Sequence, residues 1–243
     1  MLSILQKEIN TFFSSLIGYV VIGIFLVLMG LMMFVFPDTS LLNYHYATLD
    51  QLFQVAPNIF TFLIPALTMR SYAEEKQEGT IEFLTTKPLS DLQIILGKYL
   101  ANLLLVVFAL LPTLLYYYTV YKLGSPEGNL DSGATIGSYF GLIFLAAVFV
   151  AIGIFASSLT DNQIVAFVLA AFLCFLVHWG FYYISNLPVF FGKSDDFIQQ
   201  LGLEYHYTSI SRGIVDSRDV IYFLSVIAGF IMLTLLNLER RKW

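Results

Sequence analysis

The feature that most constrains this chain is a set of six long apolar runs. A run of 18 or more apolar residues can cross the hydrocarbon core of a bilayer as a helix. Charged residues make up only 12% of the 243 residues, against about 25% in ordinary soluble domains. The runs use most of the chain, so we expect one all-α integral membrane domain over residues 1–243. The six predicted spans are 16–36, 52–69, 100–120, 136–159, 164–184 and 220–238.

The segment before the first span, about residues 1–14, is amphipathic. Its apolar residues fall near one helical face, which suits a helix lying in the membrane interface. A plain extension of the first span fits the pattern about equally well. The apolar residues are Leu2, Leu5, Ile9, Phe12 and Phe13, and those away from that face are Gln6, Lys7 and Asn10.

Two of the spans carry local features of their own. The second span contains Pro57 and Pro65, so we expect a kinked helix, with Pro57 as an alternative start, because neighbouring helices can satisfy the backbone groups that proline frees. Small residues at four-residue spacing let membrane helices approach closely, so the fourth span should pack tightly. Its small residues are Gly133, Gly137, Gly141, Ala147 and Ala151.

Six spans place both termini on the same side of the membrane. That side carries eight of the twelve Lys and Arg residues, and these residues collect on the cytoplasmic side. We therefore expect the termini, the 70–98 connection and the 157–163 turn to be cytoplasmic. The connections 37–51, 121–135 and 185–219 would face outside, and the apolar residues of the last would let it dip partly into the bilayer.

The predicted spans contain no Asp, Glu, Lys or Arg. Ion-coupled transporters usually carry ionisable residues along their pathway, so this absence argues against a transporter that powers itself. His178 is the only titratable candidate in the spans, and a lone histidine is most simply a packed or interfacial residue.

No motif in the chain assembles a catalytic site. The "GKS" at 192–194 has Leu187 where a P-loop requires glycine, and the "EEK" at 74–76 has Gly79 where intramembrane proteases of the CAAX type have arginine. A catalytic or structural metal needs three or four ligands close together. The histidines, His45, His178 and His206, are scattered instead.

The 70–98 connection is the most highly charged part of the chain, with eight charged residues between Met69 and Asp91. Ser71 and Glu74 have the spacing of a capping box, which predicts a helix start. Glu74 and Glu78 would then lie one turn apart on an acidic face, with Lys76 off that face. Gly79 is a natural end for this helix.

A second helical piece is predicted to follow Pro88, because Ser90 and Gln93 also have capping-box spacing. This helix leads into the third span, and Lys98 is expected to snorkel to the interface. A loop that only sets topology would explain its Lys and Arg residues, but not its carboxylates or two predicted caps. We therefore interpret the connection as a docking surface for another protein. Its carboxylates are Glu74, Glu75, Glu78, Glu82 and Asp91.

The stretch "PALTMRSYAEEKQEGTIEFLTTKPLS" closely resembles the corresponding loop of ABC-2 type permeases, the membrane subunits of a class of ABC transporters. The six spans and the "SSLTDNQ" turn at 157–163 are similar to that family as well. The segment "YHYTSISRGIVDSRDVIYFL" (205–224) is similar to the permease subunits of gliding-motility ABC transporters of Bacteroidetes. Permeases for maturation of multi-copper enzymes and nitrous-oxide reductase are near relatives in pattern.

The resemblance implies an exporter in the bacterial inner membrane that is driven by a separate cytoplasmic ABC ATPase dimer. ATP and Mg²⁺ would be bound by that partner, with no cofactor or metal in this chain and no nucleic acid. A second permease subunit, identical or a gliding-motility auxiliary subunit, would complete the pathway. The loop after the second span would act as a coupling helix without catalytic residues. The residues expected to contact or shape the ATPase interface are Arg70, Glu74, Glu75, Lys76, Glu78, Gly79, Thr80 and Glu82.

Two other readings remain open. An intramembrane enzyme would show hydrolytic activity and no associated ATPase. A membrane anchor would pass the movement of an ATPase to a motility complex without transporting anything.

Overall fold

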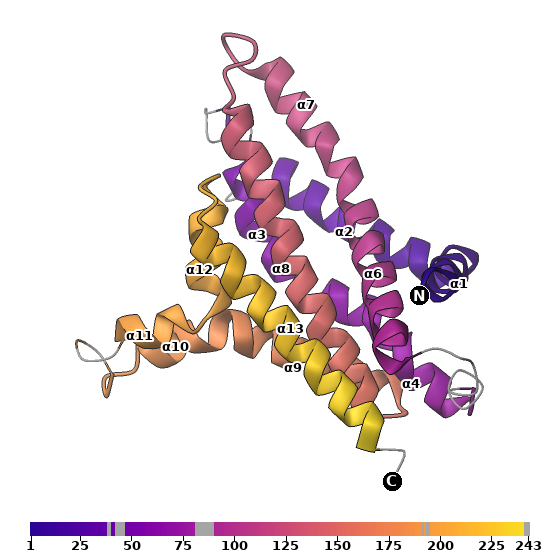
Figure 1. The fold of residues 1–243 in the computed structure, drawn as a ribbon. Helices are drawn as coiled ribbons and strands as arrows, with labels where there is room; N and C mark the ends of the chain where they lie inside the picture. Colours follow the sequence, from indigo (N-terminus) through magenta and orange to yellow (C-terminus); the bar gives the residue numbers. More distant parts are fainter. Residues whose placement is uncertain (38–39, 42–46, 81–89, 191, 193–194, 241–243) are drawn as a thin grey trace.

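The computed structural model describes the whole chain except residues 38–39, 42–46, 81–89, 191, 193–194 and 241–243. The described residues form helices and turns, with no β-strand among them, which confirms the all-α prediction. Five helical runs are long and apolar enough to cross a membrane, or six if the bent pair at the N-terminus counts as one span. Figure 1 shows the helices gathered around α8, with α10 and α11 extending away from the bundle.

The first two helices, α1 (Leu2–Ser14) and α2 (Leu16–Phe34), are separated by a sharp bend. The angle between Leu2–Ser14 and Gly18–Phe34 is 72°. Gly18 lies against the ring of Phe12, where a Cβ atom would come within 2.7 Å of Phe12 Cε1. Residues 1–14 are therefore a separate helix rather than a straight extension of the first span. The membrane interface as their location stays a prediction.

The next helices, α3 (Asp50–Thr68) and α4 (Arg70–Gln77), follow each other with only Met69 between them, and Met69 is itself helical. Pro57 and Pro65 lie inside α3, so the proposed start at Pro57 is wrong. The capping box predicted at Ser71 is also wrong, because the chain is already helical before it and no side chain caps α4.

The remaining described helices follow α4 along the chain. Ser90 and Gln93 form the predicted capping box, with each side chain accepting from the other's backbone N–H at 3.3 Å. The helices are α6 (Asp91–Leu110), η1 (Leu111–Thr113), α7 (Leu114–Leu123), α8 (Ser132–Leu159), α9 (Gln163–Phe175), η2 (Leu176–Gly180), α10 (Phe181–Ser185), α11 (Asp195–Gln200), α12 (Leu203–Ile210) and α13 (Ser217–Glu239).

Small residues on α8 allow its neighbours to pack closely, as the sequence predicts. A Cβ atom on Gly141 would lie 2.5 Å from Ile210 Cγ2 of α12, and one on Gly153 would lie 2.0 Å from Thr68 Oγ1 of α3. Gly153 was not singled out from the sequence, because the four-residue pattern stops before it. These contacts hold α12 and the end of α3 against the central helix.

We expect Gly153→Ala to destabilise the protein by about 1–3 kcal/mol, since an added methyl group would overpack the contact with Thr68. Thermal unfolding of the purified protein in detergent measures this effect. Gly229→Ala in α13 is the matched control, because no atom lies within 4 Å of its Cβ position. Equal melting temperatures for the two variants would contradict the close approach of α3 and α8.

Candidate functional site: the junction of α1, α4 and α6

A buried lysine lies at the centre of the junction between α1, α4 and α6. The ammonium group of Lys98 is 2.7 Å from Glu8 Oε1 of α1 and 2.9 Å from Glu75 Oε1 of α4. It also donates to the backbone oxygen of Ser71 at 2.7 Å. The three partners match the three N–H donors of an ammonium group. The side chain is only 1% exposed, so the prediction that Lys98 snorkels to the interface is wrong.

Lys7 adds a second positive charge to this cluster. Its ammonium group lies 2.7 Å from Glu75 Oε1 and 3.7 Å from Glu8 Oε1. Two lysines and two glutamates give the cluster no net formal charge, which is the condition under which buried charges are tolerated. We call Lys7, Glu8, Glu75 and Lys98 the ionic cluster. It joins three helices that are far apart in the sequence.

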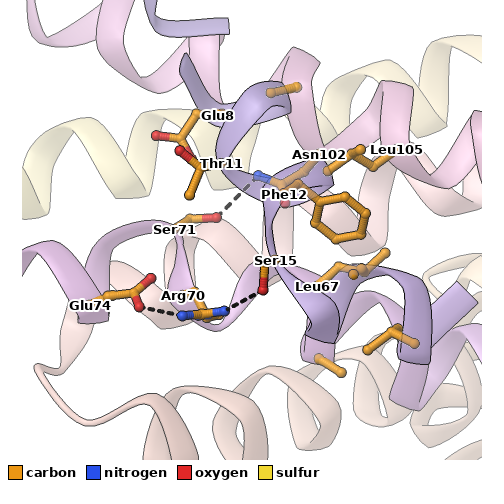
Figure 2. A pocket seen from close by; sticks show the side chains of 14 residues that line it. Glu8, Thr11, Phe12, Ser15, Leu67, Arg70, Ser71, Glu74, Asn102 and Leu105 are labelled. Carbon is orange, nitrogen blue, oxygen red and sulfur yellow. Dashed lines mark hydrogen bonds and ion pairs between the residues drawn. The ribbon is translucent and has the colours of Figure 1, made fainter. Parts of the chain in front are cut away.

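Asn102 extends the junction by one turn along α6. Its Nδ2 donates to Ser71 Oγ at 3.1 Å and to the backbone oxygen of Lys98 at 2.8 Å. Figure 2 shows the bond between Asn102 and Ser71 at a small cavity of about 70 Å³, which Glu8, Thr11 and Phe12 of α1 also line. Ser71 is therefore a link between α4 and α6.

Helix α4 is also bonded to α8. Ser157 Oγ accepts from the backbone N–H groups of Tyr72 at 3.0 Å and Ala73 at 3.1 Å, and it donates to the backbone oxygen of Met69 at 2.8 Å. A single hydroxyl thus supplies the bonds at the point where α3 passes into α4.

The same end of α8 is bonded to α13. Lys76 Nζ of α4 donates to the backbone oxygen of Ser158. Asn237 Nδ2 of α13 donates to that oxygen at 2.7 Å. Movement of α4 is therefore opposed by contacts to α1, α6, α8 and, through Ser158, α13.

The other face of α4 is more accessible. Arg70 Nη2 lies 2.5 Å from Glu74 Oε1, and Arg70 Nη1 donates to Ser15 Oγ at 3.4 Å, as Figure 2 shows. Gln77 and Glu78 are exposed. Gly79 has φ +69° directly after the end of α4, which confirms the predicted helix stop.

The structure separates the predicted coupling residues into groups. Glu75 points into the ionic cluster, Lys76 points to α8, and Thr80 Oγ1 donates to the backbone oxygen of Glu75 at 3.3 Å. These three side chains contact other parts of this chain and can hold the α4 surface in position. An exposed residue such as Glu78 can instead contact a partner protein directly. Glu82 lies outside the described residues. The residues on the more accessible side are Arg70, Glu74, Glu78 and Gly79.

Sequence reasoning missed the inward partners of α4. Glu8 was not considered, and Lys7 was only placed away from the apolar face of its helix. Gly97 was a usable signal, because its Cβ position lies 3.1 Å from Ile4 Cβ and so marks where α1 crosses α6. A glycine next to a lysine just before an apolar span can indicate such a crossing.

The arrangement ties α4 mechanically to its neighbouring helices. Its polar groups are mostly committed to one another, and within the described ranges no group of three or more His, Cys, Asp or Glu side chains could hold a metal ion. One side of α4 is exposed, and the ionic cluster connects its other side to α1 and α6.

Comparison with known families gives one match. Residues 36–216 match the family model described as ABC-2 family transporter protein. The match covers more than half of the chain, from the residues after α2 to the residues before α13. It therefore includes Glu75, Lys98 and Ser157, and excludes Lys7 and Glu8. A search of curated proteins found no match.

We expect Lys98→Met to destabilise the protein by about 3–5 kcal/mol, because it leaves two carboxylates sharing one lysine inside the junction. Thermal unfolding in detergent measures the loss. Adding Glu8→Gln should restore part of the stability, since Lys7 and Glu75 then form a neutral pair.

Lys122→Met is the control for this experiment. It removes an exposed ion pair with Glu127, which is worth at most about 1 kcal/mol. If Lys98→Met and Lys122→Met cost the same, the ionic cluster does not stabilise the junction.

Proposed function

Because the chain belongs to the ABC-2 transporter family, we propose that it is the permease subunit of an ATP-driven exporter whose ATPase is a separate cytoplasmic protein. Members of this family are membrane components of transport systems, and this chain is a multi-pass membrane protein. The observation that carries the proposal is the two-sided character of α4, with Glu78 exposed at its end, Glu74 partly exposed beside Arg70, and Glu75 buried in the ionic cluster.

The proposed mechanism begins with closure of an ATPase dimer on ATP. The ATPase would press on the outward face of α4 and on the residues that follow it. The ionic cluster would carry the displacement to α1 and α6, and Ser157 would carry it to α8. Since α3 continues into α4 through a helical residue, α3 would move with α4. The spans would then open alternately or laterally.

The positions of the charged residues are consistent with transport that is driven by a separate ATPase. The two lysines and two glutamates of the cluster lie at one end of the bundle rather than along a path through it. An ATPase dimer would bind ATP and Mg²⁺, and a second permease subunit, identical or different, would complete the pathway. We propose the bacterial inner membrane as the location, with cytoplasmic termini. A gliding-motility exporter is the subtype that the 205–224 segment favours.

Purification of the tagged protein from its native membrane in mild detergent tests the class of function. We expect a P-loop ATPase to co-purify. Hydrolytic activity without an associated ATPase would instead support an intramembrane enzyme.

Reversal of Glu74 and Glu78 to lysine tests the docking face. Repelling or unpaired charges in a protein interface can cost several kcal/mol, while exposed helix charges are worth only about 0.3–1 kcal/mol to folding. The double variant should therefore reach the membrane at near-normal levels and lose the ATPase in co-purification.

Reversal of Glu127 and Asp196 is the matched control. Glu127 is paired with Lys122 much as Glu74 is paired with Arg70, and Asp196 is exposed like Glu78. This pair changes the net charge equally and should leave the ATPase bound. If both pairs behave alike, or the inner pair abolishes expression, α4 is not the docking surface.

Cysteine labelling tests the orientation. In a chain with Cys174→Ser, single cysteines replace Gln77 or Ser125, both of which are exposed. A membrane-impermeant thiol reagent applied to intact spheroplasts should label position 125 and spare position 77. Labelling at 77 before lysis would place α4 outside and remove the coupling role.

A further inference from the structure

A second polar site lies at the end of the bundle away from α4. The start of α3, the η2 segment and α12 surround a cavity of about 540 Å³, a volume within the range of small-molecule sites. Its polar and aromatic lining includes Asp50, His178, Trp179, Glu204 and Arg212. None of these residues belongs to the ionic cluster.

His178 is the residue of this cavity that most strongly indicates a ligand site. Its side chain is 0% exposed, and its Nε2 lies 3.2 Å from Glu204 Oε2. The contact does not have hydrogen-bond geometry, and neither ring nitrogen has a hydrogen-bond partner. A buried polar group without a partner costs about 1–3 kcal/mol. Aromatic rings enclose the imidazole, with centroid separations of 5.8 Å to Phe149 and 4.9 Å to Trp179.

Glu204 is the second group of this cavity that indicates a ligand site. Burial raises the pKa of its carboxyl group, although the hydroxyl of Thr208 offsets part of this effect. Across the described part of the chain, no Lys or Arg lies within ion-pair distance of Glu204. Asp50 is a second carboxylate without an ion pair among those residues, and it is exposed at the rim. The cavity therefore has two carboxylates against the single guanidinium of Arg212.

We propose that this cavity binds a ligand through a primary ammonium group. Such a group has three N–H donors, which the neighbouring Glu204 carboxylate and the acceptor nitrogen of a neutral His178 imidazole can accept, and the Asp50 carboxylate at the rim adds negative charge that attracts the cation. The ring of Trp179 adds an aromatic surface of the kind that attracts cations. The ammonium group can come from a soluble amine or from the headgroup of an ethanolamine phospholipid.

The experiment uses the full-length chain in nanodiscs of phosphatidylcholine and phosphatidylglycerol, which contain no primary amine. The chain has two tryptophans, so Trp243→Phe leaves Trp179 as the single tryptophan reporter inside the cavity. Ethanolamine should cause a saturable change in its fluorescence, and neutral N-acetylethanolamine should not. If only nanodiscs with added phosphatidylethanolamine produce the change, the ammonium site stands and its ligand is the lipid headgroup.

Three variants in this background make the test specific. Glu204→Gln should weaken binding by about tenfold, and Asp50→Asn by about threefold, because each removes one charged acceptor. Glu127→Gln, a carboxylate outside the cavity, should leave binding unchanged. Asp50 is exposed, so its variant remains informative if Glu204→Gln does not fold.

Three results would overturn the proposal. The first is that neither ethanolamine nor phosphatidylethanolamine changes the fluorescence. The second is that the neutral analogue changes it equally, and the third is that both cavity variants bind with unchanged affinity. The assay contains no ATPase, so its outcome is independent of the proposed permease function.

Discussion

The burial of the Lys98 ammonium group is the constraint on which the junction depends. An unpaired charge in a low-dielectric interior costs several kcal/mol, and here carboxylates from two other helices lie within 2.9 Å of the ammonium group. Balancing both lysines of the cluster with both glutamates brings α1, α4 and α6 together at one point. The orientation of α4 follows from this meeting, because Glu75 has to face inward, while Glu78 is exposed where the helix ends.

The central helix supplies the second half of this arrangement. Glycines on α8 let α3 and α12 approach closely, and Ser157 bonds the backbone where α3 passes into α4. The α4 surface consequently rests on a packed set of helices rather than on a loop. A firm attachment of this kind is what the proposed coupling role requires.

Local sequence patterns predicted the features that depend on a few neighbouring residues. The apolar helices, the Ser90 capping box and the stop at Gly79 all belong to this class. The prediction at Ser71 failed because a cap requires a non-helical residue before the helix, and α3 continues through Met69. The prediction for Lys98 failed because its partner Glu8 lies 90 residues away, and no local pattern identifies such a pair. The sequence therefore indicated residues on both sides of α4, while their partners on α1, α6 and α8 needed the structure.

The 90-residue separation between Glu8 and Lys98 also has a consequence for biogenesis. At a synthesis rate of about 5–20 residues per second, Lys98 follows Glu8 out of the ribosome by roughly 5–20 s. For most of that interval neither Glu75 nor Lys98 has been made. Lys7 and Glu8 therefore lack these partners, and α1 must stay at the aqueous boundary, where water solvates its charges. Docking of α1 becomes favourable only when α6 arrives. Helix α1 is thus made well before α6 but can be fixed in place only once α6 has followed it, while the helices from α7 to α13 are still to come.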